Sequence, residues 1–176
     1  MSETRVGARH AVPVQTAPDA QALAARFPAV ELAQREDREL IVRCRPQGLL
    51  DLCVALRDEH GFDYLADLCG ADCPELRFVV RLYCTQRRDY ARISIPLDRT
   101  APRAPSLCAL WPAANWQERE AYDLFGIRFE GHPDLRRILL PTDWQGYPLL
   151  REQPAAPGAS SGESGSVGSP GEEAAP

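Results

Sequence analysis

Two cysteines stand close enough in the chain to do chemistry as a pair. Cys69 and Cys73 bracket the segment CGADC, and such a pair could ligate a metal, hold a cluster or form a redox disulfide. Structural zinc sites normally combine two pairs, and no second Cys or His pair stands near this one. Four of the six cysteines also fall at apolar-patterned positions, where a thiol behaves as a small hydrophobe. We therefore expect free, reduced thiols and no metal, with a redox disulfide between Cys69 and Cys73 as the alternative.

Two carboxylates and a histidine form the second group that could do chemistry. Glu120 and Asp123 are three residues apart on a predicted helix, and His132 follows them. Such side chains could hold a metal ion or act as acid and base. The usual companions of that chemistry are missing, since the sequence has no HExxH helix, nucleophile elbow, Walker A loop or GxGxxG turn. We expect no independent active site and no nucleotide site, and keep a stand-alone metal-dependent enzyme as the alternative.

Helices and strands alternate in the part of the chain that must position these residues. Apolar residues recur at helical spacing over 47–59 and at alternate positions over 76–84 and 90–97. The expected elements are helix 19–27, strand 39–45, helix 47–59, a weakly marked strand 62–68, a hairpin of strands 76–84 and 90–97, and helix 116–125. This order predicts an α+β fold, with helices packed on one face of a mainly antiparallel or mixed sheet, followed by an irregular C-terminal extension.

The last predicted helix has recognisable ends. Asn115 is a candidate N-cap with Glu118 at the third helical position, which is the arrangement of a capping box. Gly126 suits the left-handed residue that ends a helix. Residues 127–150 then combine turn residues and charge with Trp144 and several leucines.

Composition limits the classes of partner. The chain has 176 residues, a formal net charge of -5 and no lysine, so we expect no general affinity for nucleic acid or for an anionic membrane surface. No stretch approaches the roughly 20 consecutive apolar residues that cross a bilayer. We divide the chain into a flexible leader (1–18), an α+β domain (19–110), a helix with a partner-docking extension (111–150) and a disordered tail (151–176).

A long signature occupies the run from Trp116 to Leu149. It consists of a Glu-Arg-Glu triplet, two further residues, an acid and two apolar residues, and then a histidine before a basic and apolar cluster. This run resembles the signature of the thirty-kilodalton-type subunit of respiratory complex I, the NADH:quinone oxidoreductase. The residues that carry the resemblance are Glu118, Arg119, Glu120, Asp123, Leu124, Phe125, His132, Arg136, Ile138, Leu139, Asp143, Trp144, Gly146, Pro148 and Leu149. After Pro148 the chain departs from the family's usual basic-acidic run, which ends in an aromatic residue and a proline, and reads LLREQP over 149–154.

The resemblance implies a non-catalytic subunit of the peripheral arm of a proton-translocating enzyme. Such a chain holds no cofactor of its own, because FMN and the iron-sulfur clusters belong to partner subunits. It is expected to dock to the forty-nine-kilodalton-type subunit and the adjoining iron-sulfur subunits near the quinone-reducing module. It would then lie at the cytoplasmic face of the bacterial cell membrane and meet the membrane only through the complex. The equivalent subunit of a membrane-bound hydrogenase or of another quinone-linked dehydrogenase remains an alternative.

Dense charge and aromatic residues mark the part of the signature that we expect to meet partners. Surface ion pairs contribute only about 0 to 1 kcal/mol to stability, whereas at an interface they set register and partner choice. Ion pairing within the chain is the competing interpretation. The expected interface residues are Trp116, Glu118, Arg119, Glu120, Tyr122, Asp123, Phe125, Phe129, His132, Asp134, Arg136, Arg137, Asp143, Trp144 and Tyr147.

Overall fold

The structure, a computed structural model, describes residues 16–151. Residues 1–15 and 152–176 lie outside the described part, and with them almost all of the predicted leader (1–18) and tail (151–176). In chain order the elements are α1 (Ala20–Arg26), β1 (Val30–Glu36), β2 (Glu39–Cys44), the short 3-10 helix η1 (Pro46–Gly48), α2 (Leu49–Asp58), β3 (Tyr64–Asp72), β4 (Leu76–Cys84), β5 (Asp89–Pro96), β6 (Arg103–Pro105), α3 (Ala114–Phe125) and β7 (Arg128–Glu130).

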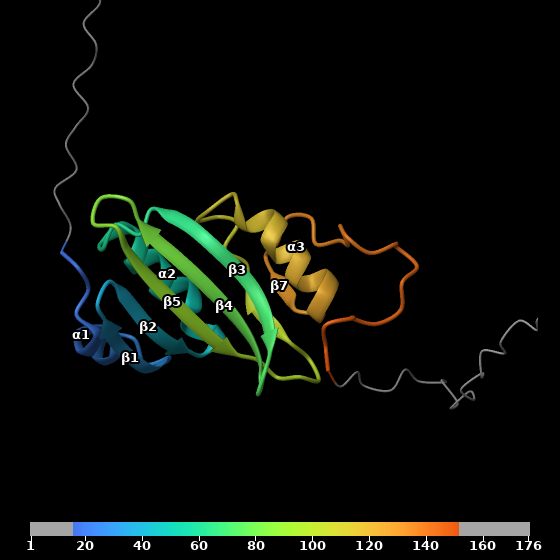
Figure 1. Cartoon of the computed structure of the whole chain (residues 1–176), viewed down its shortest axis with the longest axis horizontal. Helices are drawn as coiled ribbons and strands as arrows, with labels where there is room; N and C mark the ends of the chain where they lie inside the picture. Colours follow the sequence, from blue (N-terminus) through green and yellow to red (C-terminus); the bar gives the residue numbers. More distant parts are fainter. Residues whose placement is uncertain (1–15, 152–176) are drawn as a thin grey trace, which may run out of the picture.

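Five strands form one sheet in the order β1-β2-β5-β4-β3 (Figure 1). Three neighbouring pairs are antiparallel, and β2 with β5 is parallel. The chain therefore leaves β2 through α2 and enters the sheet again at its far edge, as β3. The sheet is mixed and mainly antiparallel, as predicted.

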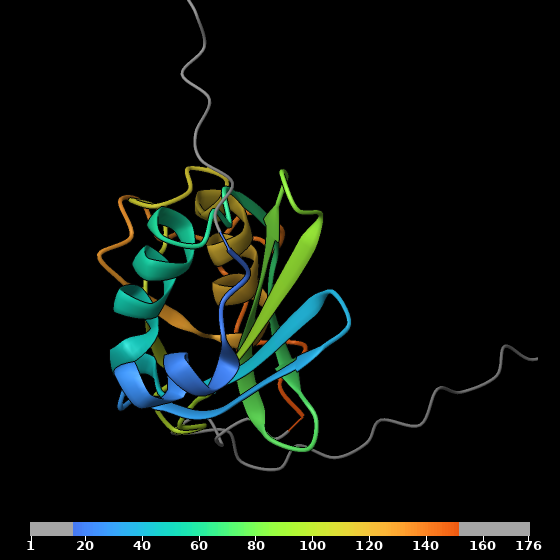
Figure 2. The same cartoon turned by 90° about the vertical axis from the view of Figure 1, so that its left-hand side faces the viewer.

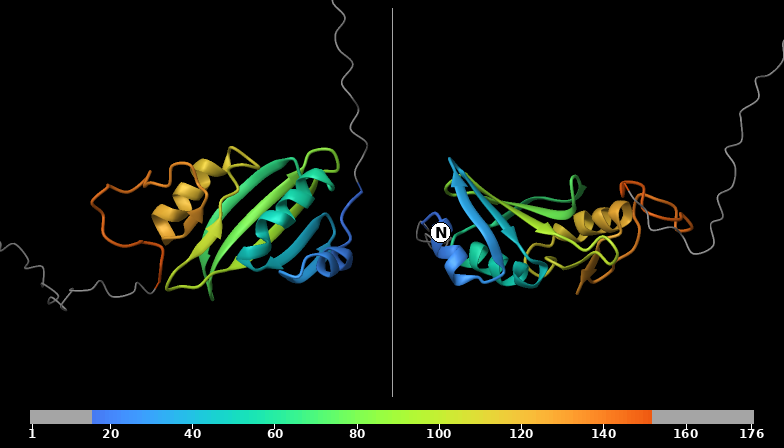
Figure 3. Two further views of the ribbon diagram at one scale, coloured as in Figure 1. Left: turned by 180° about the vertical axis from the view of Figure 1, so that it is seen from behind. Right: turned by 90° about the horizontal axis from the view of Figure 1, so that it is seen from below.

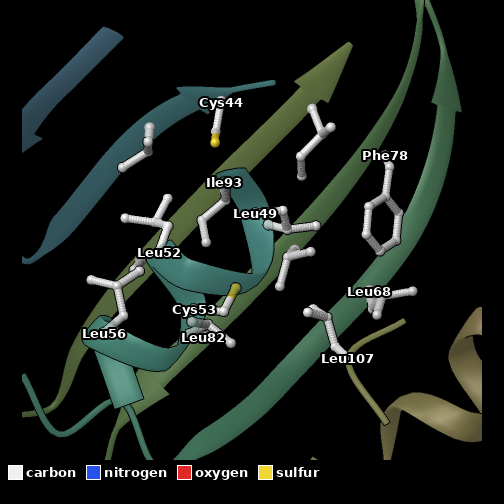
Figure 4. Close-up of a cluster of buried hydrophobic side chains, with 14 of the residues drawn as sticks. Cys44, Leu49, Leu52, Cys53, Leu56, Leu68, Phe78, Leu82, Ile93 and Leu107 are labelled. Atoms are coloured by element: carbon white, nitrogen blue, oxygen red, sulfur yellow. The ribbon is translucent and has the colours of Figure 1, made fainter. Parts of the chain in front are cut away.

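The buried face of the sheet follows from the alternation of the sequence. In β4, Phe78 and Leu82 are fully buried, while the residues on either side of each face the other side of the sheet. The apolar stripe of α2, with Leu49, Leu52 and Leu56, packs onto this face (Figure 4). Each such buried side chain contributes about 1.5–3 kcal/mol, so this layer is the main source of the fold's stability.

All three α-helices lie on the same side of the five-stranded sheet (Figure 2). The predicted α+β architecture, with helices on one face of the sheet, is confirmed. Asp19 caps α1 as expected, because its Oδ1 accepts the N–H groups of Gln21 and Ala22 at 2.7 and 3.1 Å. Among residues 16–151, no helix has the length and apolar character needed to cross a membrane.

Two strands of the five-stranded sheet differ from the sequence prediction. Strand β1 is absent from it, because β1 is an edge strand in which only Val30 is buried, so its apolar alternation is weak. Strand β3 runs to Asp72 rather than ending at residue 68. The acidic residues that made this strand look doubtful are accommodated at the surface: Asp67 is exposed, and Asp63 accepts the Thr85 N–H at 2.9 Å.

The predicted capping box of the last helix is wrong. Helix α3 begins two residues earlier, with Ala113 at the N-cap and no side-chain capping bond. Asn115 lies inside the first turn, and Glu118 turns inward toward the preceding loop. The end of the helix is as predicted, since Gly126 has a φ of 75°.

A second, two-stranded sheet joins the chain before α3 to the chain after it. Strands β6 and β7 pair parallel, and neither was predicted from the sequence. Ala104 and Phe129 form its buried face, and the Phe129 ring packs edge-on against Phe78 at 5.0 Å between centroids. Helix α3 is therefore attached to the main core at both of its ends.

Candidate functional site

Residues 131–150, called here the C-terminal segment, loop away beyond α3 (Figures 1 and 3). The segment forms no helix or strand. Its backbone N–H and C=O groups therefore need partners other than a regular ladder. Side chains of α3 and of the segment itself supply them.

Asp123 is the centre of this hydrogen bonding. Its carboxylate is fully buried and accepts the backbone N–H groups of Ile138, Leu139 and Leu140 at 3.1, 2.8 and 2.9 Å. Its other oxygen accepts from Arg137 Nη1 at 2.6 Å. Burial alone would raise the pKa of Asp123, but the hydrogen bonds from Leu140 and Arg137 outweigh it and hold this pKa below its usual value. The ionised carboxylate thus fixes three successive residues of the segment to α3.

Arg137 joins further parts of the segment to the same point. Its guanidinium donates to the C=O groups of Asp123, Trp144 and Gly146 at 3.1, 3.3 and 3.0 Å. It also lies 5.3 Å from the ring centre of Tyr147. The guanidinium is suited to this role because its five N–H donors point in fixed directions.

Arg119 is also used within the chain. It is 4% exposed, and its Nε donates to the Arg136 C=O at 3.2 Å. Its guanidinium carbon lies 4.9 Å from the Trp116 ring centre. The indole of Trp116 is itself 64% exposed, so Arg119 supports one face of an aromatic side chain that is otherwise open to solvent.

Glu118 holds the loop before α3 against the helix. Its buried carboxylate accepts the Leu107 N–H at 2.6 Å and the Ser106 hydroxyl at 2.7 Å. Burial raises the pKa of Glu118, although these hydrogen bonds partly oppose it. Ser106 is a residue that sequence reasoning missed, because nothing in its surroundings marks it as the partner of a carboxylate twelve residues later.

One group of three possible metal ligands is brought together within residues 16–151. The ligand atoms of Cys108, Glu118 and His132 all lie within 4.8 Å of one another. The histidine ring is set against ligation, because its Nδ1 accepts the Asp134 N–H at 3.0 Å and its Nε2 then carries the proton, donated to the Asn115 C=O at 3.1 Å. Binding a metal through Nε2 would move the proton to Nδ1, where it would face another N–H. This arrangement therefore fits a metal poorly.

The metal or acid-base group considered from the sequence is not assembled. His132 lies 4.0 Å from Glu118, not beside Glu120 or Asp123. Asp123 is occupied by its four donors, and Glu120 is exposed at the edge of a cleft of about 340 Å³ that Cys69 also lines.

The CGADC segment, residues 69–73, allows helix α3 to pack closely on strand β3. Cys69 and Cys73 are both free thiols in the structure, half-buried and exposed respectively. Between them, Gly70 lies under α3: a Cβ at this position would come within 2.4 Å of the Phe125 ring. The helix can approach β3 this closely because residue 70 has no side chain.

The end of the C-terminal segment is fixed to the sheet. Asp72, the last residue of β3, accepts the Arg151 N–H at 2.9 Å and forms two hydrogen bonds with Arg99, one of them of 2.8 Å. The Leu149 N–H donates to the Leu124 C=O at 3.1 Å. Sequence reasoning missed Asp72 and Arg99, which lie far from the segment along the chain.

Three large apolar side chains are among those that this framework leaves outside. Leu139, Trp144 and Leu149 are 58%, 47% and 49% exposed, and with Trp116 they make up half of the eight large exposed hydrophobic residues in the described part of the chain. Soluble monomers rarely gather such residues on one segment unless the segment meets a partner.

The fifteen expected interface residues fall into three groups. Buried are Glu118, Arg119, Asp123 and Phe129; partly buried are Tyr122, Phe125, His132, Arg137 and Tyr147; exposed are Trp116, Glu120, Asp134, Arg136, Asp143 and Trp144. The structure therefore separates side chains that shape the segment from side chains that it presents.

Comparison with known proteins decides the family. The family described as "Respiratory-chain NADH dehydrogenase, 30 Kd subunit" matches residues 42–158, from β2 through the whole C-terminal segment. The chain belongs to this family.

Two bacterial relatives, each named as the C subunit of an NADH-quinone oxidoreductase, illustrate the likeness. The one from Moorella thermoacetica is 44% identical over 135 residues, which are 75% of this chain and 90% of the relative. The one from a Roseiflexus species is 41% identical over 139 residues, 75% of this chain and 80% of the relative.

Solved structures show the same fold for this member of the 30 Kd family. A trypsin-resistant fragment of Nqo5 aligns with a TM-score of 0.56 and 30% identity, over 65% of this chain and 96% of the fragment. A chain of the membrane-bound sulfane sulfur reductase, an archaeal respiratory membrane complex, aligns with a TM-score of 0.59 and 24% identity, over 70% of this chain and 75% of that one. At 24% identity, the similarity to the reductase chain shows a shared fold and nothing about function.

Proposed function

We propose that this chain is a non-catalytic, cofactor-free subunit in the peripheral arm of a proton-translocating NADH:quinone oxidoreductase. Its C-terminal segment and the exposed side of α3 dock against the forty-nine-kilodalton-type subunit and the adjoining iron-sulfur subunits, and so scaffold the quinone-reducing module. FMN and the iron-sulfur clusters belong to partner subunits of the complex. The chain meets the cytoplasmic face of the bacterial cell membrane only through the complex. Membership of the 30 Kd family and the names of the relatives support this proposal.

The main support for the docking role is that the C-terminal segment has charged, hydrogen-bonded side chains on its inner side and large apolar side chains on its outer side. Inside, Asp123 and Arg137 hold the backbone in place with buried, charge-assisted hydrogen bonds. Outside, Leu139, Trp144 and Leu149 are about half exposed. A loop that is already ordered loses less conformational freedom when it binds, and tryptophan is a frequent anchor of protein interfaces. The buried residues of the signature thus have a shaping role and the exposed ones a contact role.

Co-purification tests the proposal. The full-length chain, carrying an affinity tag and expressed in its own host, should purify with a forty-nine-kilodalton-type subunit and iron-sulfur subunits, in a preparation that reduces quinone with NADH. The chain purified alone should contain no stoichiometric iron, flavin or zinc. Turnover of a substrate by the isolated chain, a redox centre held by it, or association with unrelated proteins alone would contradict the proposal.

A further inference from the structure

A cleft of about 460 Å³ opens between the small β6–β7 sheet and the C-terminal segment, and its charged lining is of one sign. The lining residues are Thr100, Ala101, Pro102, Arg103, Gly126, Arg128 and Tyr147. Two of them are arginines and none is acidic. This is unexpected in a chain whose formal net charge is -5.

The two arginines are neighbours across the parallel pair. Arg103 and Arg128 are Cα partners in the register of β6 and β7. Strand alternation buries the adjacent residues Ala104 and Phe129 and turns both arginines outward, where they are exposed. Like charges placed opposite each other on neighbouring strands repel, so this pair lowers the stability of the small sheet unless an anion lies between them.

The chain offers these arginines little compensation. Arg103 reaches Glu130 at 3.5 Å, but the two side chains are 58% and 64% exposed, and such a pair contributes little. No carboxylate among residues 16–151 forms an ion pair with Arg128. A carboxylate that neutralises Arg103 and Arg128 would therefore have to come from outside residues 16–151.

We propose that this cleft receives a carboxylate side chain, Asp or Glu, from an acidic segment of the neighbouring subunit that covers the C-terminal segment. A guanidinium matches a carboxylate with two parallel hydrogen bonds, and two guanidiniums can grip it from both sides. The occupant is a polypeptide because the cleft adjoins the apolar surface: Tyr147, which forms its wall, lies between Trp144 and Leu149 in the chain. The partner expected to cover those two residues is therefore the source that we assign to the carboxylate. This inference rests on the proposed docking function and adds the chemistry of the partner.

The absence of lysine from the chain allows a direct test. In the Arg128→Lys variant, residue 128 keeps its positive charge and carries the chain's single side-chain amine. Zero-length carbodiimide coupling of the assembled complex should join it to an Asp or Glu of another subunit, as read by mass spectrometry of the linked peptides. The Arg88→Lys variant, in the turn between β4 and β5, is the matched control and should not yield that linked peptide. Failure of residue 128 to form an intersubunit link, or links only to the chain's own glutamates beyond residue 151, would overturn the inference.

Charge reversal tests the same contact by affinity. The full-length Arg103→Glu/Arg128→Glu variant should bind the rest of the complex about tenfold more weakly or worse, and the loss should shrink as salt rises. The control Arg38→Glu/Arg88→Glu makes the same change of charge in the turns at β1–β2 and β4–β5, and should bind normally. Equal binding of both variants would refute the acidic contact but leave the docking proposal standing, provided that the chain still enters the complex. A chain that enters no complex would refute both.

Discussion

Replacing Asp123 with asparagine should release the C-terminal segment from α3 without opening the sheet. The amide has the size of the carboxylate but no charge, and its NH₂ group must face either Arg137 or the N–H groups of residues 138–140. Removing one partner of a buried ion pair costs about 3–5 kcal/mol. Arg137 keeps its carbonyl acceptors and is 14% exposed, so we take the lower end, about 3 kcal/mol. That corresponds to roughly a hundredfold change in the equilibrium for local opening.

Amide hydrogen exchange measures this opening residue by residue. The N–H groups of Ile138, Leu139 and Leu140 should exchange about a hundredfold faster in Asp123→Asn, while sheet amides such as that of Ile93 keep their protection. Asp134→Asn is the control, because Asp134 is exposed and, within residues 16–151, its carboxylate forms an ion pair with Arg136 alone. If the three amides exchange less than about threefold faster in Asp123→Asn, or equally fast in both variants, the role given to Asp123 is wrong.

Three further predictions concern packing, pH and thiol reactivity. Gly70→Ala should lower the free energy of unfolding by about 1–3 kcal/mol in urea denaturation, because the new Cβ would press on the Phe125 ring. Adding Phe125→Leu to this variant should recover part of the loss. If the effects of the two substitutions on the free energy of unfolding simply add, the contact between the two residues is contradicted. Burial raises the pKa of Glu118, so the contribution of this side chain to the free energy of unfolding is complete at low pH and declines as the pH rises through that pKa. The melting temperature of Glu118→Gln, measured relative to the parent chain, should therefore increase from pH 4 to pH 7. A difference that stays constant over this range would contradict the raised pKa. A thiol-specific disulfide reagent at pH 8 should modify Cys73 first, since it is exposed whereas burial raises the pKa of Cys44 to about 11; Cys73→Ser should remove the fast phase, and its persistence would show another reactive thiol.

The main sheet was predictable because burial on one face imposes a period of two. Residues 76–84 and 90–97 show that period clearly, and β4 and β5 match them almost residue for residue. Strand β1 has only one neighbour and little to bury, so its sequence carries too weak a pattern. The three-residue strands β6 and β7 are defined by contact between distant parts of the chain, which no local pattern reveals.

The candidate site was located by resemblance, but its internal organisation was not. Charge alone does not distinguish Arg119, which is buried, from Arg136, whose side chain is 69% exposed. Glu118 satisfied the spacing of a capping box, yet its carboxylate is drawn to the N–H of Leu107 and a hydroxyl in the preceding loop. The hydrogen-bond partners of these side chains depend on which donors and acceptors the tertiary fold brings near them. They could therefore not be predicted from the sequence.

We propose that the apolar outer side of the C-terminal segment attaches this chain to its complex. Leu139, Trp144 and Leu149 should be replaced together by serine, and membranes from cells carrying only this variant assayed for NADH:quinone reductase activity and for the chain in the purified complex. The matched control replaces Leu32, Leu50 and Tyr64, which are 48%, 39% and 56% exposed on other parts of the surface.

We predict that the first variant is lost from the complex together with the activity, while the melting temperature of the isolated chain changes by no more than about 3 °C. A fully active complex that retains the first variant, or loss of the chain only with the control set, would contradict the claim.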